Sequence, residues 1–443
     1  MEYLVLGIFC ASLLVCIILN ISILYALVFG LLLFMLYGRQ KGFSWRELTT
    51  MALSGVKTVR NILFIFLLIG IMTALWRASG TIPYIVCQAS KLIRPSVFLL
   101  MTFLLNSVLS VLTGTSFGTA ATMGVICASM GTAMNVNPLL TGGAILSGCY
   151  FGDRCSPVST SALLVASITK TDIYSNIRNM IKSAFIPFVL SCLLYLVSGI
   201  FFPGTGDGMD LEKLYSGSFV LHWQTILPAI VILLLSVFRI DVKWAMGASI
   251  VSAILVCLLV QGLPVSDLFK ACIFGYTPRD AEAAMTMSGG GIVSMLKVGC
   301  IVCISSAYTD LFNKTGLLDG ARQAVAAFAN RTTVFAGVAI SAIVTGMIAC
   351  NQTLTILLTN QITEGLYTDQ DRHALDLEDT AVVIAPLIPW SIAGAVPLAA
   401  VNAPETAVMA SFYLILLPLC RLPDAITRKH LLSINRAKKG KIR

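Results

Sequence analysis

The segment Gly152–Ser161, "GDRCSPVSTS", places one carboxylate, Asp153, among hydroxyl side chains and a proline. Hard cations prefer oxygen ligands, and the hydroxyls of Ser156, Ser159 and Thr160 would add to those of the carboxylate. If the group is buried, a proton and a small cation compete for it, and such competition is the physical basis of exchange. The alternative is a surface carboxylate that caps a helix or pairs with Arg154.

Three further segments carry oxygen-bearing side chains in apolar surroundings. They are "TGTSFGTAAT" from Thr113, "TGMIACNQTLT" from Thr345 and "EDTAVVIAPLIPWSIAGA" from Glu378. The predicted ion- and substrate-binding residues are Asp153, Ser156, Ser159, Thr160, Thr113, Thr115, Ser116, Asn351, Gln352, Asp379, Trp390 and Ser391, with Asp153 as the expected sodium ligand. No other metal or cofactor is expected, and a sodium ion or a proton would be the coupling ion.

Each of these segments also has a plainer interpretation. Serine and threonine pack helices together in membranes without binding anything. Glu378 and Asp379 end an acidic loop, and Trp390 could anchor a helix at the membrane interface.

The composition indicates an integral membrane protein that is entirely α-helical. Of the 443 residues, 57% are hydrophobic and 12% are charged, whereas soluble domains are about half apolar and a quarter charged. Apolar runs approach or exceed the roughly 20 residues that cross a bilayer, and the first and last are long enough for two passages each. We expect eleven to thirteen membrane elements. The runs are 3–36, 62–76, 97–111, 183–202, 220–237, 244–260, 292–307, 333–348 and 380–419.

Basic residues predict the orientation. The formal net charge is +9, and much of the excess lies in 39–60 and in the tail 421–443. Basic flanks stay on the cytoplasmic side, so both segments should be inside a cytoplasmic membrane of bacterial type. The acidic loop 362–379, with one arginine, should face outside. Retention on the cytoplasmic side of the lipid bilayer explains the basic tail better than binding to nucleic acid does.

The broken segments suggest two halves of similar plan. The apolar pieces on either side of Asp153 are too short to cross separately, and irregular backbone at membrane depth must be buried in protein or reached by water. We therefore expect re-entrant hairpins or unwound helices near 113–122 and 148–164 in a first half, 1–240. A second half, 291–420, would carry breaks near 345–360 and 378–396, after an amphipathic connection at 241–290. Paired interruptions point to the central site of a secondary transporter.

Other functional classes fit less well. The close pair Cys300 and Cys303 has no second pair or nearby histidine, so the thirteen cysteines are interpreted as small apolar residues. The absence of a histidine–acid cluster, a metal motif or a nucleophile elbow argues against an enzyme. An ion channel is the alternative from another class, and paired breaks favour alternating access over an open pore.

The chain resembles the NhaC-type sodium/proton antiporters of the ion transporter superfamily over about residues 40–420. Five segments carry the resemblance in order: "GFSWREL", "TGTSFGTAATMG", "SGCYFGDRCSP", "DIYSNIRNM" and "LEDTAVVIAPLIPW". The resemblance implies inverted repeats, paired re-entrant hairpins and a homodimer. It also implies sodium/proton exchange or, as the alternative, cation-coupled exchange of a small organic anion of malate or lactate type; an amino acid is a further alternative.

One departure bears on the substrate. The family pattern after the proline is Ser-Asp-Thr-Thr-Asn, whereas this chain reads Ser159, Thr160, Ser161, Ala162 and Leu163. One acid and one amide are missing. A site with fewer charges should hold sodium more weakly, or accept an organic molecule whose own carboxylate completes it.

Overall fold

Helices account for nearly all of the regular structure in the computed structural model, which describes residues 2–19, 21–90, 94–204, 215–238, 240–280, 283–284, 287–315 and 332–423. Four helices are long and apolar enough to cross a membrane: α4 (Arg60–Ala78), α6 (Pro95–Thr113), α11 (Ile173–Phe201) and α14 (Val242–Leu259). The expected all-α membrane fold is confirmed. Most of the basic tail lies outside the described residues.

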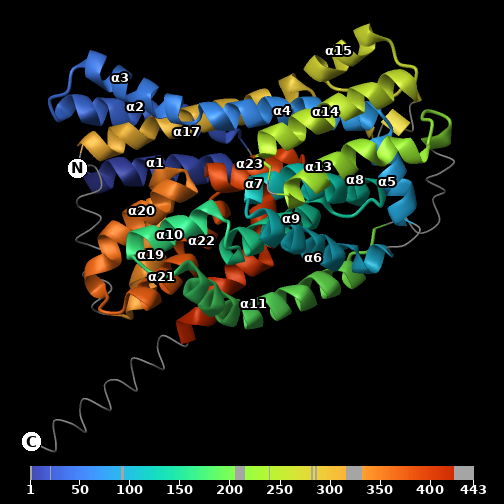
Figure 1. Ribbon diagram of the computed structural model, residues 1–443. Coiled ribbons are helices and arrows are strands. Elements are labelled where there is room, and N and C mark those ends of the chain that lie inside the picture. The colour runs from blue at the N-terminus through green and yellow to red at the C-terminus, as the bar shows by residue number, and fades with distance from the viewer. Residues whose placement is uncertain are drawn as a thin grey trace, which may run out of the picture.

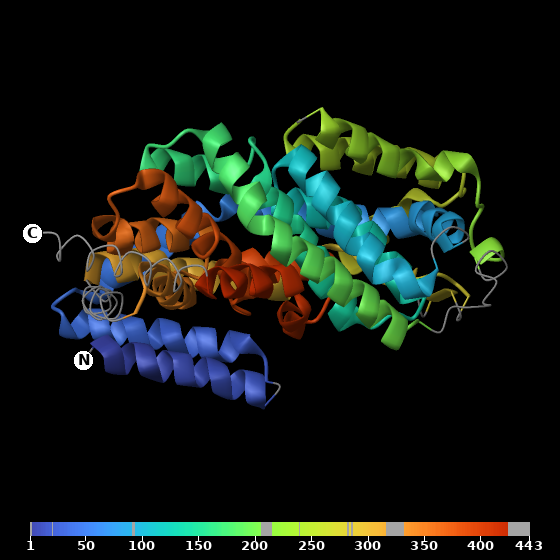
Figure 2. The same ribbon diagram turned by 90° about the horizontal axis from the view of Figure 1, so that it is seen from below.

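The remaining spans are built from shorter helices. The first apolar run forms two, α1 (Glu2–Ile18) and α2 (Ile23–Gln40). The others in the same outer layer are α3 (Trp45–Thr58), α5 (Thr81–Ser90), α13 (Leu227–Val237), α15 (Val265–Phe274) and α17 (Leu296–Thr315). Figure 1 shows most of these helices running along one direction, with α11 along the opposite face of the molecule. Figure 2 shows α1 and α2 packed side by side at one edge.

The first half contains a helix hairpin followed by a broken helix. Gly114, in the left-handed conformation (φ 66°), ends α6, and the chain returns through α7 (Ser116–Thr119), a π-turn and α8 (Val125–Ala133). Next come α9 (Pro138–Cys155) and α10 (Thr160–Thr169), separated by an extended break at 156–159. A β-carbon on Gly114 would lie 2.9 Å from the backbone nitrogen of Ser159. The hairpin tip therefore packs directly on the break.

The second half repeats this plan. The hairpin is α19 (Val334–Ala349) and α20 (Gln352–Thr363), which meet at Cys350 (φ 55°). The broken helix is α21 (Gln370–Glu378) with α22 (Ala381–Ile384), followed by α23 (Ile392–Ala400), and the two parts are bent by 57°. The amide of Ile392 donates to the carbonyl of Cys350 at 2.7 Å, so this hairpin tip also contacts its break.

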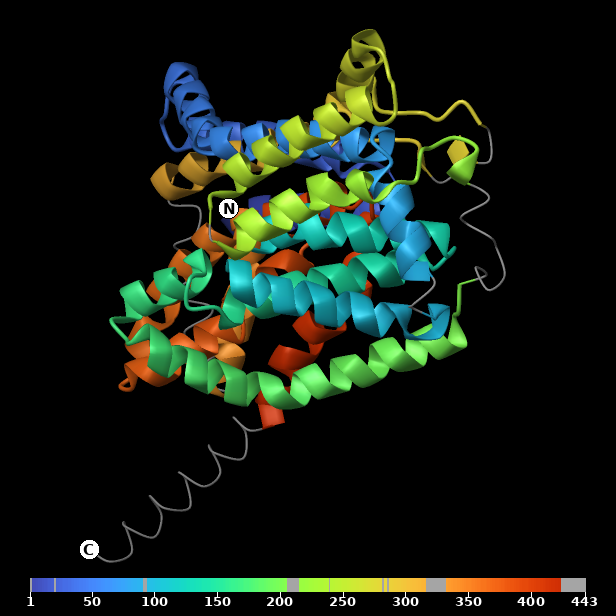
Figure 3. The same cartoon turned by 45° about the vertical axis from the view of Figure 1, so that its right-hand side comes forward.

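The two hairpins enter from opposite ends of the molecule. In Figures 1 and 3, α6, α8 and α9 lie toward one end, whereas α10, α19, α20 and α21 lie toward the other. The breaks consequently meet near the middle. This is the paired arrangement expected of an inverted-repeat transporter.

One expectation about orientation is wrong. Arg421, near the end of the last described helix (Phe412–Pro423), is 2.6 Å from Asp379 and 3.4 Å from Asp376, so the acidic segment and the start of the basic tail lie at one end of the molecule. Figure 1 shows the α2–α3 turn at the same end. The hairpin α19–α20 returns to the side from which it enters. The sequence-based prediction counts each apolar run as one complete crossing of the membrane, so it places the following acidic segment on the wrong side.

Candidate functional site

Asp153 lies in the last turn of α9, immediately before the first break, with 3% of its surface exposed. Its Oδ1 accepts a hydrogen bond from Ser159 Oγ at 3.0 Å, and its Oδ2 accepts one from Ser161 Oγ at 3.2 Å. Gln352, at the start of α20, donates its Nε2 to the same Oδ2 at 3.3 Å. Side chains from both halves therefore meet at this carboxylate.

Gln352 also donates to the carbonyl of Val382, at 3.2 Å. Val382 lies in α22, in the part of the second broken helix that precedes the break. A single amide thus connects Asp153, the tip of the second hairpin and the second broken helix. Movement of any of these three elements would change the surroundings of Asp153.

Arg154 does not pair with Asp153. It is fully buried, and its guanidinium forms a salt bridge with Asp379 and donates to Ser183 Oγ at 2.8 Å. The remaining donors reach the carbonyls of Glu378 and Met180 and the hydroxyl of Tyr413, at 3.2–3.3 Å. Arg154 therefore joins α9 to α11, to the end of α21 and to the last helix.

Asp379 is neutralised by two arginines. Arg154 pairs with its Oδ1 and Arg421 with its Oδ2. Asp379 is fully buried, so neither an external loop position nor a free coupling carboxylate describes it. A salt bridge of this kind costs desolvation and is retained where its partners are well hydrogen-bonded. Asp379 holds the two halves together.

Glu378 was not among the predicted site residues, although it is the least satisfied acid in the region. Its side chain is fully buried, and neither carboxylate oxygen has a hydrogen-bond partner among the described residues. It lies within electrostatic range of Asp153, Arg154 and Asp379. A buried carboxylate without a partner needs a proton or a cation to offset its lost hydration.

Sequence periodicity indicates that the two acids differ in their partners, but only the structure shows which acid is paired. Consecutive residues on a helix point about 100° apart, so only one of Glu378 and Asp379 can face a given partner. Arg154 forms a salt bridge with the carboxylate of Asp379, whereas it bonds Glu378 only through the backbone carbonyl. The carboxylate of Glu378 therefore has no hydrogen-bond partner among the described residues.

The other predicted residues have mixed outcomes in the structure. Ser156 is buried in the first break. Thr115 and Asn351 cap helices, accepting from the amides of Gly118 and Leu354, and Ser391 caps α23 by accepting from Ala393. Thr113 Oγ1 lies 3.2 Å from Thr119 Oγ1, and Ser116 is buried beside them.

The structure contradicts one expectation, for Thr160, and one alternative interpretation, for Trp390. Thr160 is exposed, and Ser159 and Ser161 on either side of it make the hydrogen bonds to Asp153. Trp390 is 4% exposed, and its indole donates to the carbonyl of Met347 at 2.9 Å. It therefore fastens the second break to α19 and is not an interfacial anchor.

Comparison with known proteins identifies the family. Residues 1–163 and 148–420 match the Na+/H+ antiporter family. The chain belongs to this family. It is accordingly an integral membrane protein and a secondary transporter of small ions or organic substrates.

Characterised relatives differ in what their names say they exchange. The chain is 27% identical to a malate-2H+/Na+-lactate antiporter of Bacillus subtilis, over 87% of this chain and 85% of the relative. It is 28% identical to the Na+/H+ antiporter NhaC of Alkalihalophilus pseudofirmus, over 83% and 82%. Identity to the arginine/ornithine antiporter ArcD of Halobacterium salinarum is 26%, over 84% and 79%.

Proposed function

We propose that this transporter exchanges sodium ions for protons at the carboxylate pair, defined as Asp153 and Glu378. One observation carries the proposal. Of the four buried acids in this region, Asp376 and Asp379 form salt bridges with arginines, whereas Asp153 and Glu378 form no salt bridge among the described residues. The carboxylate pair is therefore the place where a cation or protons would compensate the charge.

Asp153 is the cation ligand in this proposal. Sodium takes oxygen ligands, and Ser159, Ser161 and the amide of Gln352 already surround the carboxylate. When the ion arrives, these hydroxyls can turn their lone pairs toward it, because each donates to the carboxylate through a proton that rotates freely. At the break, the carbonyl of Ser156 accepts from the amide of Ser159, and that of Ser159 accepts from the amide of Leu163, so the carbonyls of Pro157 and Val158 are the candidates for further oxygen ligands.

Glu378 supplies a second proton-binding position. Its charge is attracted by that of Arg154 and repelled by those of Asp153 and Asp379, and a cation bound at Asp153 would offset the repulsion and favour ionisation of both members of the pair. Sodium entry then displaces protons from the pair, and sodium release allows them to return. The breaks from both halves surround this position, so rocking one half against the other would expose it to each side alternately.

The test is the number of protons released when sodium binds to the purified protein. A pH indicator in weakly buffered solution reports the protons, and calorimetry reports the sodium. Asp153→Asn should abolish sodium binding, and Glu378→Gln should keep binding but release fewer protons. Asp371→Asn, at an exposed acid, is the matched control. Unchanged stoichiometry in Glu378→Gln would remove Glu378 from the mechanism, and normal sodium binding by Asp153→Asn would overturn the site.

Cation-coupled exchange of a small organic anion is the second candidate function. It is favoured by the malate/lactate antiporter among the relatives. We propose that the protein works as a carrier, neither a channel nor an enzyme. Labelled substrate should enter proteoliposomes faster when unlabelled substrate is inside; a flux that ignores the internal substrate and does not saturate would indicate a channel.

We further propose that the end containing Arg421 is cytoplasmic and that two copies form a homodimer. The basic residues near that end support the first, and the resemblance supports the second. Light scattering of the detergent-solubilised protein measures the assembly, and a monomeric mass would exclude the dimer.

A further inference from the structure

A cavity of about 210 Å³ lies apart from the carboxylate pair. Helices α4, α8 and α9 line it together with residues 288–295 and 399–403. Arg77, in the last turn of α4, is the one charged side chain among these lining residues. Serine, threonine and asparagine side chains supply the other polar groups.

Arg77 lines this cavity and has one nitrogen without a hydrogen-bond partner among the described residues. Its Nη1 donates to the carbonyl of Ser288 at 2.7 Å, whereas its buried Nε has no hydrogen-bond partner within the described residues. No carboxylate in that part of the chain forms a salt bridge with it. Arg77 is half-buried, and a bound anion would supply the counter-ion that the described residues do not.

The loop beside Arg77 is fixed by glycines. Gly291 donates its amide to the carbonyl of Gly70 in α4 at 2.7 Å. Gly290 has φ 77°, and a β-carbon there would lie 2.5 Å from the backbone nitrogen of Ala74. Only glycine allows this approach. Because the loop is held against α4, the carbonyl of Ser288 is held in place and orients the guanidinium.

The cavity suits a small molecule with a carboxylate and a hydroxyl group. Its volume equals about seven waters at roughly 30 Å³ each, well below the 300–1,000 Å³ typical of drug-sized ligands. Guanidinium groups bind carboxylates through paired hydrogen bonds. The hydroxyls of Ser129, Thr132 and Ser294 donate to backbone carbonyls three or four residues earlier in the chain, so their oxygens are left as acceptors for a ligand hydroxyl.

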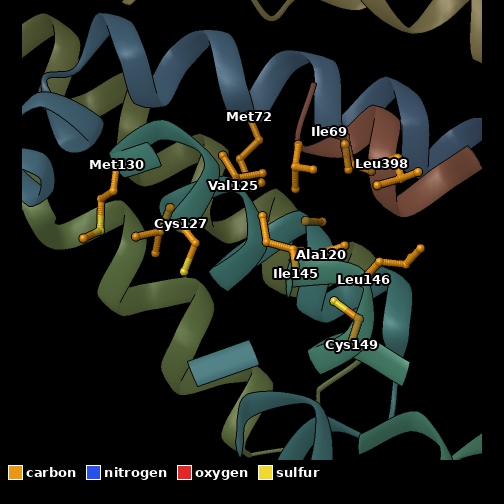
Figure 4. Close-up of a cluster of buried hydrophobic side chains, with 14 of the residues drawn as sticks. Ile69, Met72, Ala120, Val125, Cys127, Met130, Ile145, Leu146, Cys149 and Leu398 are labelled. Atoms are coloured by element: carbon orange, nitrogen blue, oxygen red, sulfur yellow. The ribbon is translucent and has the colours of Figure 1, made fainter. Parts of the chain in front are cut away.

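An apolar layer separates the cavity from the carboxylate pair. Val125 and Ile145 line the cavity, and Leu146 and Cys149 follow along α9 in the same buried cluster. Figure 4 shows these side chains together between the helices. Asp153 lies eight residues beyond Ile145 on α9, or about 12 Å at 1.5 Å per residue. A ligand at Arg77 therefore does not touch Asp153.

We propose that the Arg77 cavity binds a small hydroxycarboxylate, with Arg77 holding the carboxylate and the hydroxyl oxygens accepting from the ligand hydroxyl. This site goes beyond sodium/proton exchange at the carboxylate pair. The Arg77 cavity would be the binding site for the organic anion in the second candidate function. Its test does not depend on the role of Asp153.

The test is calorimetric titration of the full chain in nanodiscs of phosphatidylcholine, a lipid without net charge, with lactate, propionate and inorganic phosphate as probes. Lactate should bind more tightly than propionate, which lacks the hydroxyl. Arg77→Gln should weaken lactate binding at least tenfold, and Arg46→Gln, at an exposed arginine on α3, should leave it unchanged.

A second variant keeps the proposal testable if Arg77→Gln does not fold. Asn402 lines the cavity at φ 58°, and Asn402→Gly removes its amide while keeping a residue that tolerates this backbone; it should weaken lactate binding severalfold. Absence of lactate binding to the wild-type protein, or equal binding by Arg77→Gln, would overturn the proposal. Phosphate binding as tight as lactate would refute the carboxylate class. Sodium-driven proton release, measured on the same samples, tests the carboxylate pair separately.

Discussion

Gln352 Nε2 lies 3.3 Å from Asp153 Oδ2, which joins the tip of the second hairpin to the break of the first broken helix. The two residues are 199 positions apart in the sequence. The same amide also bonds the carbonyl of Val382, so three elements that would move in alternating access share one side chain. Ion binding at Asp153 can thereby influence both halves.

Gln352→Ala should weaken sodium binding by about tenfold. The substitution removes a donor that orients and stabilises the ionised carboxylate, and a hydrogen bond to a charged group contributes about 1.5 kcal/mol or more, or roughly tenfold in affinity. Sodium titration by calorimetry at fixed pH measures it. Thr353→Ala, at the exposed neighbouring residue, is the control, and equal affinities in the two variants would exclude Gln352 from the site.

Ser161→Ala should lower sodium affinity severalfold, whereas Thr160→Ala should not. Ser161 Oγ bonds Asp153, while Thr160 is exposed. The pair is closely matched because both substitutions remove a hydroxyl from the first turn of α10. Sodium-dependent proton release in proteoliposomes measures the difference. A larger loss in Thr160→Ala would restore Thr160 as a site residue.

The positions of the breaks could be predicted from the sequence because interruptions in apolar runs have a direct physical cause. Backbone groups at membrane depth must find partners, and the segments around Gly114, Ser156 and Cys350 do so by packing on one another. The meeting of Asp153, Ser159 and Gln352 follows from the same reasoning, since both breaks face the centre.

The assignment of charges could not be predicted in this way. Arg154 follows Asp153 directly, yet neighbouring residues on a helix do not face each other, and its partner comes from the other half. Arg421 reaches Asp379 from the last helix. These contacts depend on how α9, α11, α21 and the last helix pack together. The periodicity of apolar residues does not predict that packing. Glu378 could be recognised only after Asp379 had been paired.

Arg154→Gln should destabilise the protein by about 3–5 kcal/mol, the usual cost of removing one partner from a buried ion pair. Arg421→Gln should cost less, because the Arg421 side chain is 14% exposed and Asp379 would keep Arg154. Tryptophan fluorescence during thermal unfolding in detergent gives the order of stability.

The double variant Arg154→Gln/Asp379→Asn tests whether the loss is electrostatic. Removing both charges should recover part of the stability, because residues in one network are not additive. If the double variant lost the full sum of the two single effects, the salt bridge would not be the reason for the destabilisation.

Cysteines placed at Lys41 and Asp371 should react with a membrane-impermeant reagent from the same side. Both positions are exposed, and the α2–α3 turn and the start of α21 lie at one end in Figure 1. We expect that side to be cytoplasmic, because Arg39, Lys41 and Arg421 lie near this end and basic residues are retained inside. Labelling should therefore succeed in inverted vesicles and fail in intact cells.

His222→Cys provides the opposite case. His222 is exposed and lies in the connection between α11 and α13, which Figure 1 shows at the other end of the molecule. This cysteine should be labelled in intact cells. The background should carry Cys300→Ser, because Cys300 is itself exposed. Labelling of Lys41→Cys and Asp371→Cys from different sides would mean that α19–α20 crosses the membrane, and the paired re-entrant arrangement around Asp153 would then be wrong.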